Sequence, residues 1–237
     1  MVSPLGEAAL IFVISAVGCL VFGRWTIRAL SRAQCVAPPR YEDCPPLSAY
    51  QAAKQATPTM GGLCVLLVGI AVATISGGLA HRDGWLVLAA VAGLGAVGLL
   101  DDWLKFRGVN ALGLRSAPKL LVALAIGAGV GLATSVAPHQ YSAVELPWLH
   151  RAVELGWTWV PFAMLVVAGC AHAVNLTDGM DGLAAGCVAL VLMVLGCWTL
   201  FGEPQGRVLL PWCASLAGAC VGFLWFNSFP EIGRAHV

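Results

Sequence analysis

Long apolar runs without charged residues constrain the fold of this chain more than any other feature. A helix that crosses a bilayer needs roughly 20 mostly apolar residues. The strands of an outer-membrane barrel would instead alternate between apolar and polar residues. The sequence therefore predicts an all-α, polytopic membrane protein with about seven transmembrane helices. The apolar runs fall at about 8–23, 59–80, 84–100, 120–138, 158–174, 182–201 and 208–226.

Charged residues are scarce, which excludes several other classes of protein. They make up 11% of the 237 residues, whereas a soluble domain carries about 25%. A formal net charge of +1 provides no basic surface for nucleic acid. Most of the nine cysteines lie within apolar runs, where a thiol packs as a small apolar group. We predict a single integral membrane domain over residues 1–230.

The positive charges predict how the chain is oriented, because Lys and Arg concentrate in the cytoplasmic segments of membrane proteins. Ten of the 13 fall after the first, third, fifth and seventh spans. The first run also has no basic residue before it, which argues against a cleaved signal peptide. We expect the N-terminus to lie outside and these four segments to face the cytoplasm.

Four of the six aspartates form two tight clusters, and both clusters fall on the expected cytoplasmic side. Asp101 and Asp102 close the third span, and adjacent carboxylates repel each other unless a cation lies nearby. Lys105, at i+3 or i+4, would compensate in part, and a divalent ion would compensate further. Carboxylates suit Mg²⁺, which leaves positions for substrate phosphates. Solvation of a helix end is the alternative; we predict a functional pair.

The second cluster contains Asn175, Asp178 and Asp181, spaced three residues apart. They share one helical face if the helix continues. Gly179 and Gly182 favour instead a break in the helix or a close approach of backbone to a ligand. A plain glycine-rich turn between two spans is the alternative without a function.

Two further polar segments fall on the same expected side. Lys54 precedes Thr57-Pro-Thr59 at the entry to the second span, where a cation would meet a phosphate, and Asn227 ends the last span. Pro58 biases Thr57 away from helix, so Thr59 is also a candidate helix cap. Four polar segments are therefore expected at one face of the membrane.

These four segments together resemble a known family. T-P-T-M-G-G, G-L-L-D-D-W-L-K, N-L-T-D-G-M-D-G-L-A and G-F-L-W-F-N follow one another between about residue 54 and about residue 230. In order and spacing they are similar to the phospho-N-acetylmuramoyl-pentapeptide transferases. That family is a branch of the polyprenyl-phosphate N-acetylhexosamine-1-phosphate transferases.

The resemblance implies a transferase of the bacterial inner membrane with about ten helices. It implies transfer of phospho-MurNAc-pentapeptide from UDP to undecaprenyl phosphate, which gives lipid I and UMP for peptidoglycan synthesis and requires Mg²⁺. Asp101 and Asp102 match the catalytic pair, with Asp101 as a metal ligand. The other matched positions are Lys54 and Asn227 in catalysis, and Thr59, Lys119, Asn175, Asp178 and Asp181 in substrate binding.

The chain departs from the family pattern in two places. The loop 33–53 contains two Pro-Pro pairs that are unusual for the family. After Asn227 the family continues with a third aspartate that binds the metal and with further helices, whereas this chain continues with 231–237. We expect that segment to be a non-native tail of an incomplete chain that is inactive alone.

Two other functions are weighed against this one. A related transferase would use UDP-GlcNAc or another amino sugar, which the motifs do not separate fully. A cation-coupled transporter would need acidic residues in the middle of spans, whereas these aspartates lie at span ends. The sequence leaves open a direct or a covalent mechanism, and a monomer or a homodimer.

Overall fold

The computed structural model describes residues 3–32, 61–107, 114–136, 143–146, 151–178, 181–202 and 204–228. Lys54 and Thr59, both predicted site residues, lie outside these ranges. The longer helices are α1 (Pro4–Arg32), α3 (Gly62–Ala73), α4 (Arg82–Phe106), α5 (Ser116–Ser135), α6 (Trp159–Thr177), α7 (Leu183–Phe201) and α8 (Leu210–Asn227). The shorter elements are η1 (Thr74–Gly78), β1 (Ala143–Leu146), β2 (Arg151–Glu154), η2 (Gly156–Thr158) and η3 (Pro204–Leu209).

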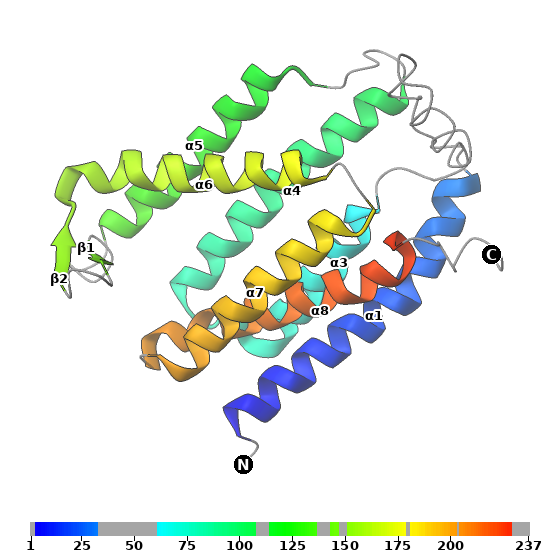
Figure 1. Ribbon diagram of the computed structural model, residues 1–237, viewed down its shortest axis with the longest axis horizontal. Coiled ribbons are helices and arrows are strands. Elements are labelled where there is room, and N and C mark those ends of the chain that lie inside the picture. Colours follow the sequence, from blue (N-terminus) through cyan, green and yellow to red (C-terminus); the bar gives the residue numbers. More distant parts are fainter. Residues whose placement is uncertain are drawn as a thin grey trace.

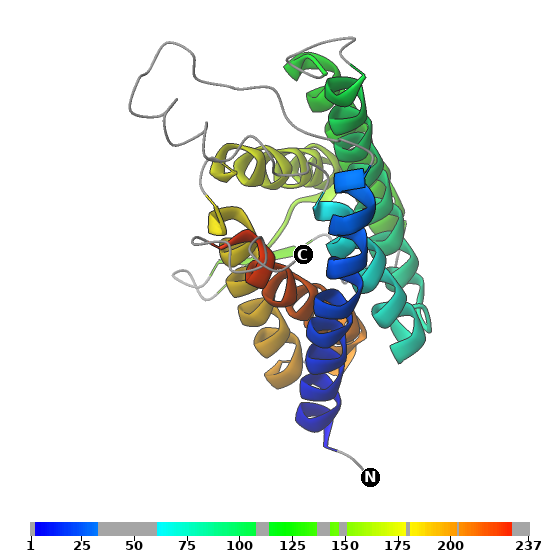
Figure 2. The same ribbon diagram turned by 90° about the vertical axis from the view of Figure 1, so that its right-hand side faces the viewer.

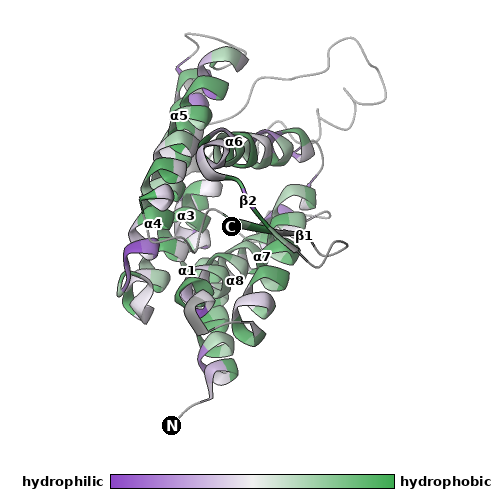
Figure 3. Ribbon diagram, turned by 90° about the vertical axis from the view of Figure 1, so that its left-hand side faces the viewer, coloured by the Kyte–Doolittle hydropathy of each residue, from purple (hydrophilic) through white to green (hydrophobic). Residues whose placement is uncertain are grey.

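The helices correspond to the apolar runs of the sequence. Within the described ranges, six are long and apolar enough to cross a membrane, and the apolar helix over Gly62–Gly78 is shorter. Figure 3 shows hydrophobic residues along the helices and hydrophilic residues concentrated toward helix ends. The prediction of an all-α, polytopic membrane protein is therefore confirmed, and over the second apolar run the described residues form the helix Gly62–Gly78.

Two local features of the structure go beyond the predicted apolar runs. The third span was expected over about 84–100, but α4 runs from Arg82 to Phe106 and holds both aspartates in its last turns. Polar residues continue the backbone hydrogen bonds of a helix beyond the stretch that is apolar. The segment between α5 and α6 contains the antiparallel pair β1 and β2, with Val144 opposite Val153.

Helix α8 is the centre of one part of the bundle and packs against α1, α3 and α7. It lies between α1 and α7 in both perpendicular views (Figure 1, Figure 2). Gly218 and Gly222, one turn apart, face the backbone of Phe12 and Ala16 on α1, where an added Cβ would collide. Small residues at i and i+4 let two membrane helices approach closely.

Helices α5 and α6 form a second closely packed pair, again through glycines at the contact. A Cβ added at Gly127 would lie 2.7 Å from Met164 Cα, and one at Gly131 would lie 3.1 Å from Val160 Cα. Trp159 Nε1 also donates a hydrogen bond to Thr134 Oγ1 over 2.8 Å. This pairing fixes α6 relative to α5.

Polar side chains that are buried between α8 and its neighbours form hydrogen bonds from one element to another. Ser15 Oγ on α1 donates to the Ser215 carbonyl over 2.6 Å. Trp212 Nε1 donates to the Gly78 carbonyl over 2.9 Å, where η1 ends the α3 segment. The thiols of Cys19 and Cys64 are buried with a sulfur–sulfur distance of 3.3 Å. These contacts place the start of α3 beside α1 and α8.

Candidate active site

Asp101 is the only charged side chain that is buried in the described part of the chain. It lies near the end of α4, and both of its carboxylate oxygens are engaged. Lys105 Nζ donates to Oδ2 over 2.6 Å, and Lys119 Nζ on α5 lies 2.8 Å from Oδ1. A buried carboxylate is tolerated when cations and hydrogen-bond donors compensate its charge. Asp101 therefore holds two lysines at the end of the bundle.

The backbone adds a third donor to the same carboxylate. Leu114 N donates to Asp101 Oδ1 over 2.6 Å, and Leu114 lies just before α5 begins at Ser116. The carboxylate thus joins the end of α4 to the entry of α5. Lys119, one turn into α5, pairs with the same carboxylate oxygen, Asp101 Oδ1.

Asp102 is in a different environment from its neighbour. Its side chain is 34% exposed, against 9% for Asp101, and its Oδ1 is 3.3 Å from Lys105 Nζ. Lys105 therefore bridges both aspartates, as its spacing predicted. Asp101 is engaged by protein donors, while Asp102 remains open to a ligand.

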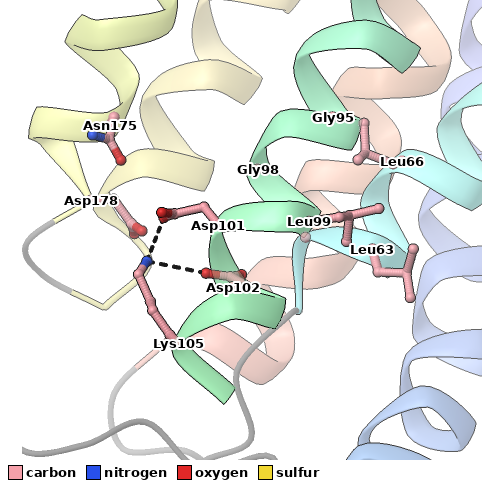
Figure 4. Close-up of a pocket in the computed structure, with 11 residues that line it drawn as sticks. Leu63, Leu66, Gly95, Gly98, Leu99, Asp101, Asp102, Lys105, Asn175 and Asp178 are labelled. Carbon is pink, nitrogen blue, oxygen red and sulfur yellow. Dashed lines mark hydrogen bonds and ion pairs between the residues drawn. The ribbon is translucent and has the colours of Figure 1, made fainter. Parts of the chain in front are cut away.

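A pocket of about 280 Å³ opens beside these carboxylates. Its polar half contains Asp101, Asp102 and Lys105 of α4, with Asn175 and Asp178 from the end of α6 (Figure 4). Figure 4 shows the side chain of Asp178 near that of Asp101, with the Lys105 ammonium below them and paired to Asp101 and Asp102. The two predicted aspartate clusters thus meet in one pocket.

The helix carrying the second cluster breaks, as the glycines favoured. Helix α6 ends at Thr177, and α7 begins after Gly182, whose φ of 74° is in the left-handed region. Asn175 and Asp178 are exposed before this break and line the pocket. Asp181 lies within the break, directly before Gly182, and is not among the lining residues of the pocket.

Asn227 lies close to the break without lining the pocket. A Cβ added at Gly182 would be 3.7 Å from the Asn227 carbonyl oxygen, so the end of α8 touches the start of α7. Four of the predicted residues line the pocket, and Lys119 reaches it through Asp101. The four are Asp101, Asp102, Asn175 and Asp178.

The polar half of the pocket contains oxygen ligands of the kind that Mg²⁺ binds. Among the described residues, no group of three or more His, Cys, Asp and Glu side chains is arranged to hold a metal. Asp102 and Asp178 do present carboxylates to the pocket, and Asn175 presents an amide oxygen. Mg²⁺ is commonly held by one or two carboxylates together with substrate phosphates. These two carboxylates and the amide are of the kind that Mg²⁺ binds, so the residues fit an ion that takes its remaining ligands from elsewhere.

Sequence reasoning missed the other half of the pocket. Its lining is apolar and comes from the start of α3 and the last turns of α4: Gly62, Leu63, Leu66, Gly95, Gly98 and Leu99. The pattern of α4 contained a signal, because Gly95, Gly98, Leu99 and Asp102 follow the i, i+3, i+4, i+7 spacing of one helical face. The Leu114 backbone contact left no signal in the sequence.

Comparison with known proteins agrees with this arrangement. Residues 84–237 match the family described as "Glycosyl transferase family 4". This region includes α4 and α6, which supply the polar half of the pocket.

Individual relatives extend the match toward the N-terminus. The phospho-N-acetylmuramoyl-pentapeptide-transferase of Methylacidiphilum infernorum is 34% identical over 92% of this chain and 65% of its own length. That of Anaplasma marginale is 34% identical over 97% of this chain and 70% of its own length. That of Thermodesulfovibrio yellowstonii is 35% identical over 75% of this chain and 54% of its own length.

The chain thus spans between about half and 70% of the length of these relatives. The family match covers three of the four polar segments, from Asp101 to Asn227, and two of these meet in the pocket. From the family match and the relatives together, the chain belongs to glycosyl transferase family 4, within the group of phospho-N-acetylmuramoyl-pentapeptide-transferases.

Proposed function

We propose that this chain carries the phosphoryl-transfer site of an enzyme that moves phospho-MurNAc-pentapeptide from UDP to undecaprenyl phosphate. The products would be lipid I and UMP. The observation that carries the proposal is the pocket in which Asp101, Asp102 and Lys105 of α4 meet Asn175 and Asp178 of α6. Such a site at the ends of apolar helices suits one lipid phosphate and one water-soluble diphosphate. We place it at the cytoplasmic face of the bacterial inner membrane, because the positive charges of the sequence concentrate there.

In the proposed reaction an oxygen of the lipid phosphate attacks the phosphorus that bears the sugar. The new phosphorus–oxygen bond forms as the pyrophosphate bond breaks, and UMP leaves with the electron pair. Phosphoryl transfer depends mainly on positioning and on stabilising negative charge. The proposed attack is direct and forms no enzyme-bound intermediate; an aspartyl intermediate is the alternative.

The contacts suggest different roles for the two adjacent aspartates. Asp101, whose oxygens accept from Lys105, Lys119 and the Leu114 backbone, would position both lysines toward the phosphates. Asp102, the more exposed carboxylate, would orient the lipid phosphate at the charged end of the pocket. Lys105 contacts both carboxylates and would neutralise charge on the substrate.

We further propose that Mg²⁺ is the cofactor and that Asp102 and Asp178 hold it. Mg²⁺ would supply neutralisation of the diphosphate and of the leaving UMP. The sequence prediction that Asp101 binds the metal stays a prediction, and the two lysines on its oxygens favour the neighbouring carboxylates. Asn175 would add an amide oxygen for the metal or the nucleotide.

The proposal is tested with the full-length protein in detergent, supplied with undecaprenyl phosphate, Mg²⁺ and either UDP-MurNAc-pentapeptide or UDP-GlcNAc. We expect a lipid-linked sugar phosphate and UMP in equal amounts from UDP-MurNAc-pentapeptide only. Product from UDP-GlcNAc instead would favour the related amino-sugar transferase. No product from either donor would contradict the proposed function.

A further inference from the structure

We propose that Cys19 and Cys64 are a site of reversible oxidation, at which a disulfide forms between α1 and α3 and distorts the pocket. The proposed function uses neither thiol. Formation of the disulfide is independent of that function, whereas the effect of the disulfide on turnover rests on it.

The two thiols face each other from separate helices. Cys19 Sγ on α1 lies 3.3 Å from Cys64 Sγ on α3, and the two residues are 45 positions apart. Cys64 Sγ is also 3.7 Å from the Cys19 carbonyl oxygen. In Figure 2 the start of α3 lies beside α1. Since a disulfide bond is about 2.05 Å long, the sulfurs need to approach by only about 1 Å to form one.

Close helix packing encloses this thiol pair. A Cβ added at Gly18 would lie 3.2 Å from Val68 Cγ1 of α3, and one added at Gly222 of α8 would lie 3.0 Å from Cys19 Cβ. Cys19 is 0% exposed and Cys64 is 2% exposed. The packing therefore holds the two sulfurs against each other and keeps dissolved reagents away from them.

The surroundings of the pair favour a disulfide over a bound metal. A metal would require thiolates, and an apolar environment does not compensate their charge. A disulfide is neutral and loses nothing there. Among the described residues, no group of three or more His, Cys, Asp and Glu side chains is arranged to hold a metal. The neighbours that pack against the pair are apolar: Phe22, Val65, Val68, Ala219 and Phe223.

The same surroundings select the oxidant. Cys64 lies in the first turn of α3, where the N-cap Gly61 makes no side-chain hydrogen bond, and weakly held helix ends open locally at low cost. A quinone dissolved in the bilayer can reach a thiol that opens there, whereas a charged, water-soluble disulfide cannot. Both S–H bonds break and one S–S bond forms, while two electrons and two protons reduce the quinone to the quinol. A dithiol reverses the oxidation by thiol–disulfide exchange.

The disulfide would act on the pocket through the first turns of α3. Gly62, Leu63 and Leu66, which flank Cys64, line the pocket. Figure 4 shows α3 between α4 and α1, so a bond to Cys19 draws this end of α3 away from α4. A displacement of about 1 Å can lower the rate of an enzyme about a hundredfold. Oxidation should therefore lower turnover.

The first test detects the bond itself, in the full-length protein in vesicles of phosphatidylethanolamine and phosphatidylglycerol. With Cys35→Ala and Cys44→Ala as the background, residues 1–60 contain only Cys19 and residues 61–164 contain only Cys64. Free thiols are blocked with N-ethylmaleimide, and cyanogen bromide then cleaves after Met60 and Met164. We expect decylubiquinone to leave the two fragments joined on a non-reducing gel, and glutathione disulfide to leave them apart.

Two variants control this measurement. Cys64→Ala should abolish the joined fragments. Cys220→Ala removes a different buried thiol, on α8, and should leave the fragments joined. Fragments that stay apart after decylubiquinone, or that are joined only by glutathione disulfide, would overturn the proposal.

The second test measures the rate of lipid-linked product formation on the same vesicles. We expect decylubiquinone to lower the rate at least about tenfold, dithiothreitol to restore it, and Cys64→Ala to keep its own rate in the presence of the quinone. Joined fragments with an unchanged rate would overturn the effect on the pocket. If the unoxidised protein forms no product, the proposed function fails instead, and the fragments still decide whether the disulfide forms.

Discussion

Lys119 Nζ on α5 lies 2.8 Å from Asp101 Oδ1 on α4, and this ion pair joins two transmembrane helices at the edge of the pocket. The two residues are 18 positions apart, and the side chains are 21% and 9% exposed. Asp101 also accepts from Lys105 and from the Leu114 backbone. One buried carboxylate thus sets the position of two lysines and of the connection between the helices.

We predict that Lys119→Ala lowers both stability and activity of the full-length protein. Loss of one partner of a buried group costs about 1–3 kcal/mol, and here Lys105 and the Leu114 backbone still compensate Asp101. Thermal unfolding in detergent measures the first effect, and kcat/KM measures the second.

Two controls accompany this variant. Lys119→Arg keeps the cation and should retain most of the stability, while Arg115→Ala removes an exposed cation from the start of the same helix. If Lys119→Ala unfolds at the same temperature as Arg115→Ala, the ion pair does not join the helices.

We predict that Asp102→Asn weakens metal binding. Mn²⁺ is a suitable probe because it prefers the same oxygen ligands as Mg²⁺ and is visible by electron paramagnetic resonance. Loss of one carboxylate ligand should reduce the affinity of the full-length protein about tenfold or more, since loss of even a hydrogen-bond partner of a metal ligand costs about 10–100-fold. Glu154→Gln, an exposed carboxylate of β2, should have no effect. Unchanged Mn²⁺ affinity in Asp102→Asn would show that Asp102 does not bind the metal.

We predict that Gly218→Val destabilises the bundle around α8. The new side chain would collide with the backbone of Phe12 on α1, and overpacking of this kind costs about 1–3 kcal/mol. Thermal unfolding in detergent measures the loss. Gly129→Val, where the same side chain meets open space, is the control. Equal melting temperatures for the two variants would mean that α1 does not pack against Gly218.

We predict that Trp212→Phe also destabilises the protein. It leaves the Gly78 carbonyl without the hydrogen bond that Trp212 Nε1 donates over 2.9 Å, and an unsatisfied buried acceptor costs about 1–3 kcal/mol. Trp198→Phe, at a side chain that is 76% exposed, should leave the melting temperature nearly unchanged. If the two variants have the same melting temperature, the hydrogen bond from Trp212 to the Gly78 carbonyl does not stabilise the protein.

Much of the site could be predicted from the sequence because charged side chains are unfavourable beside long apolar runs. Asp101, Asp102 and Asp178 are charges in a chain that otherwise avoids them near apolar runs, and membrane topology brings them to one end of the bundle. Lys105 was predictable from helical spacing alone. Lys119 was predicted only by family resemblance, since its contact with Asp101 crosses between two helices.

The apolar half of the pocket could not be predicted with the same means. Leu63, Leu66 and Leu99 look like any lipid-facing leucine in a membrane helix, and only the packing of α3 on α4 shows that they line a cavity. The extension of α4 beyond its apolar run could be anticipated only from the helical spacing of Asp101 and Lys105, because hydropathy ends before the backbone hydrogen bonds do. Register between distant helices is a tertiary property that hydropathy does not contain.

The most direct test of the account is the rate of lipid-linked product formation by the full-length protein carrying Asp101→Asn. An asparagine keeps the shape of the side chain but cannot hold Lys105 and Lys119 as ion pairs. We predict that the rate with UDP-MurNAc-pentapeptide, undecaprenyl phosphate and Mg²⁺ falls at least about a hundredfold, the scale seen when a positioned charge-stabilising group is lost. Glu154→Gln should keep the rate of the unsubstituted protein. An Asp101→Asn variant that turns over at the unsubstituted rate would contradict the claim that this pocket is the site of phosphoryl transfer.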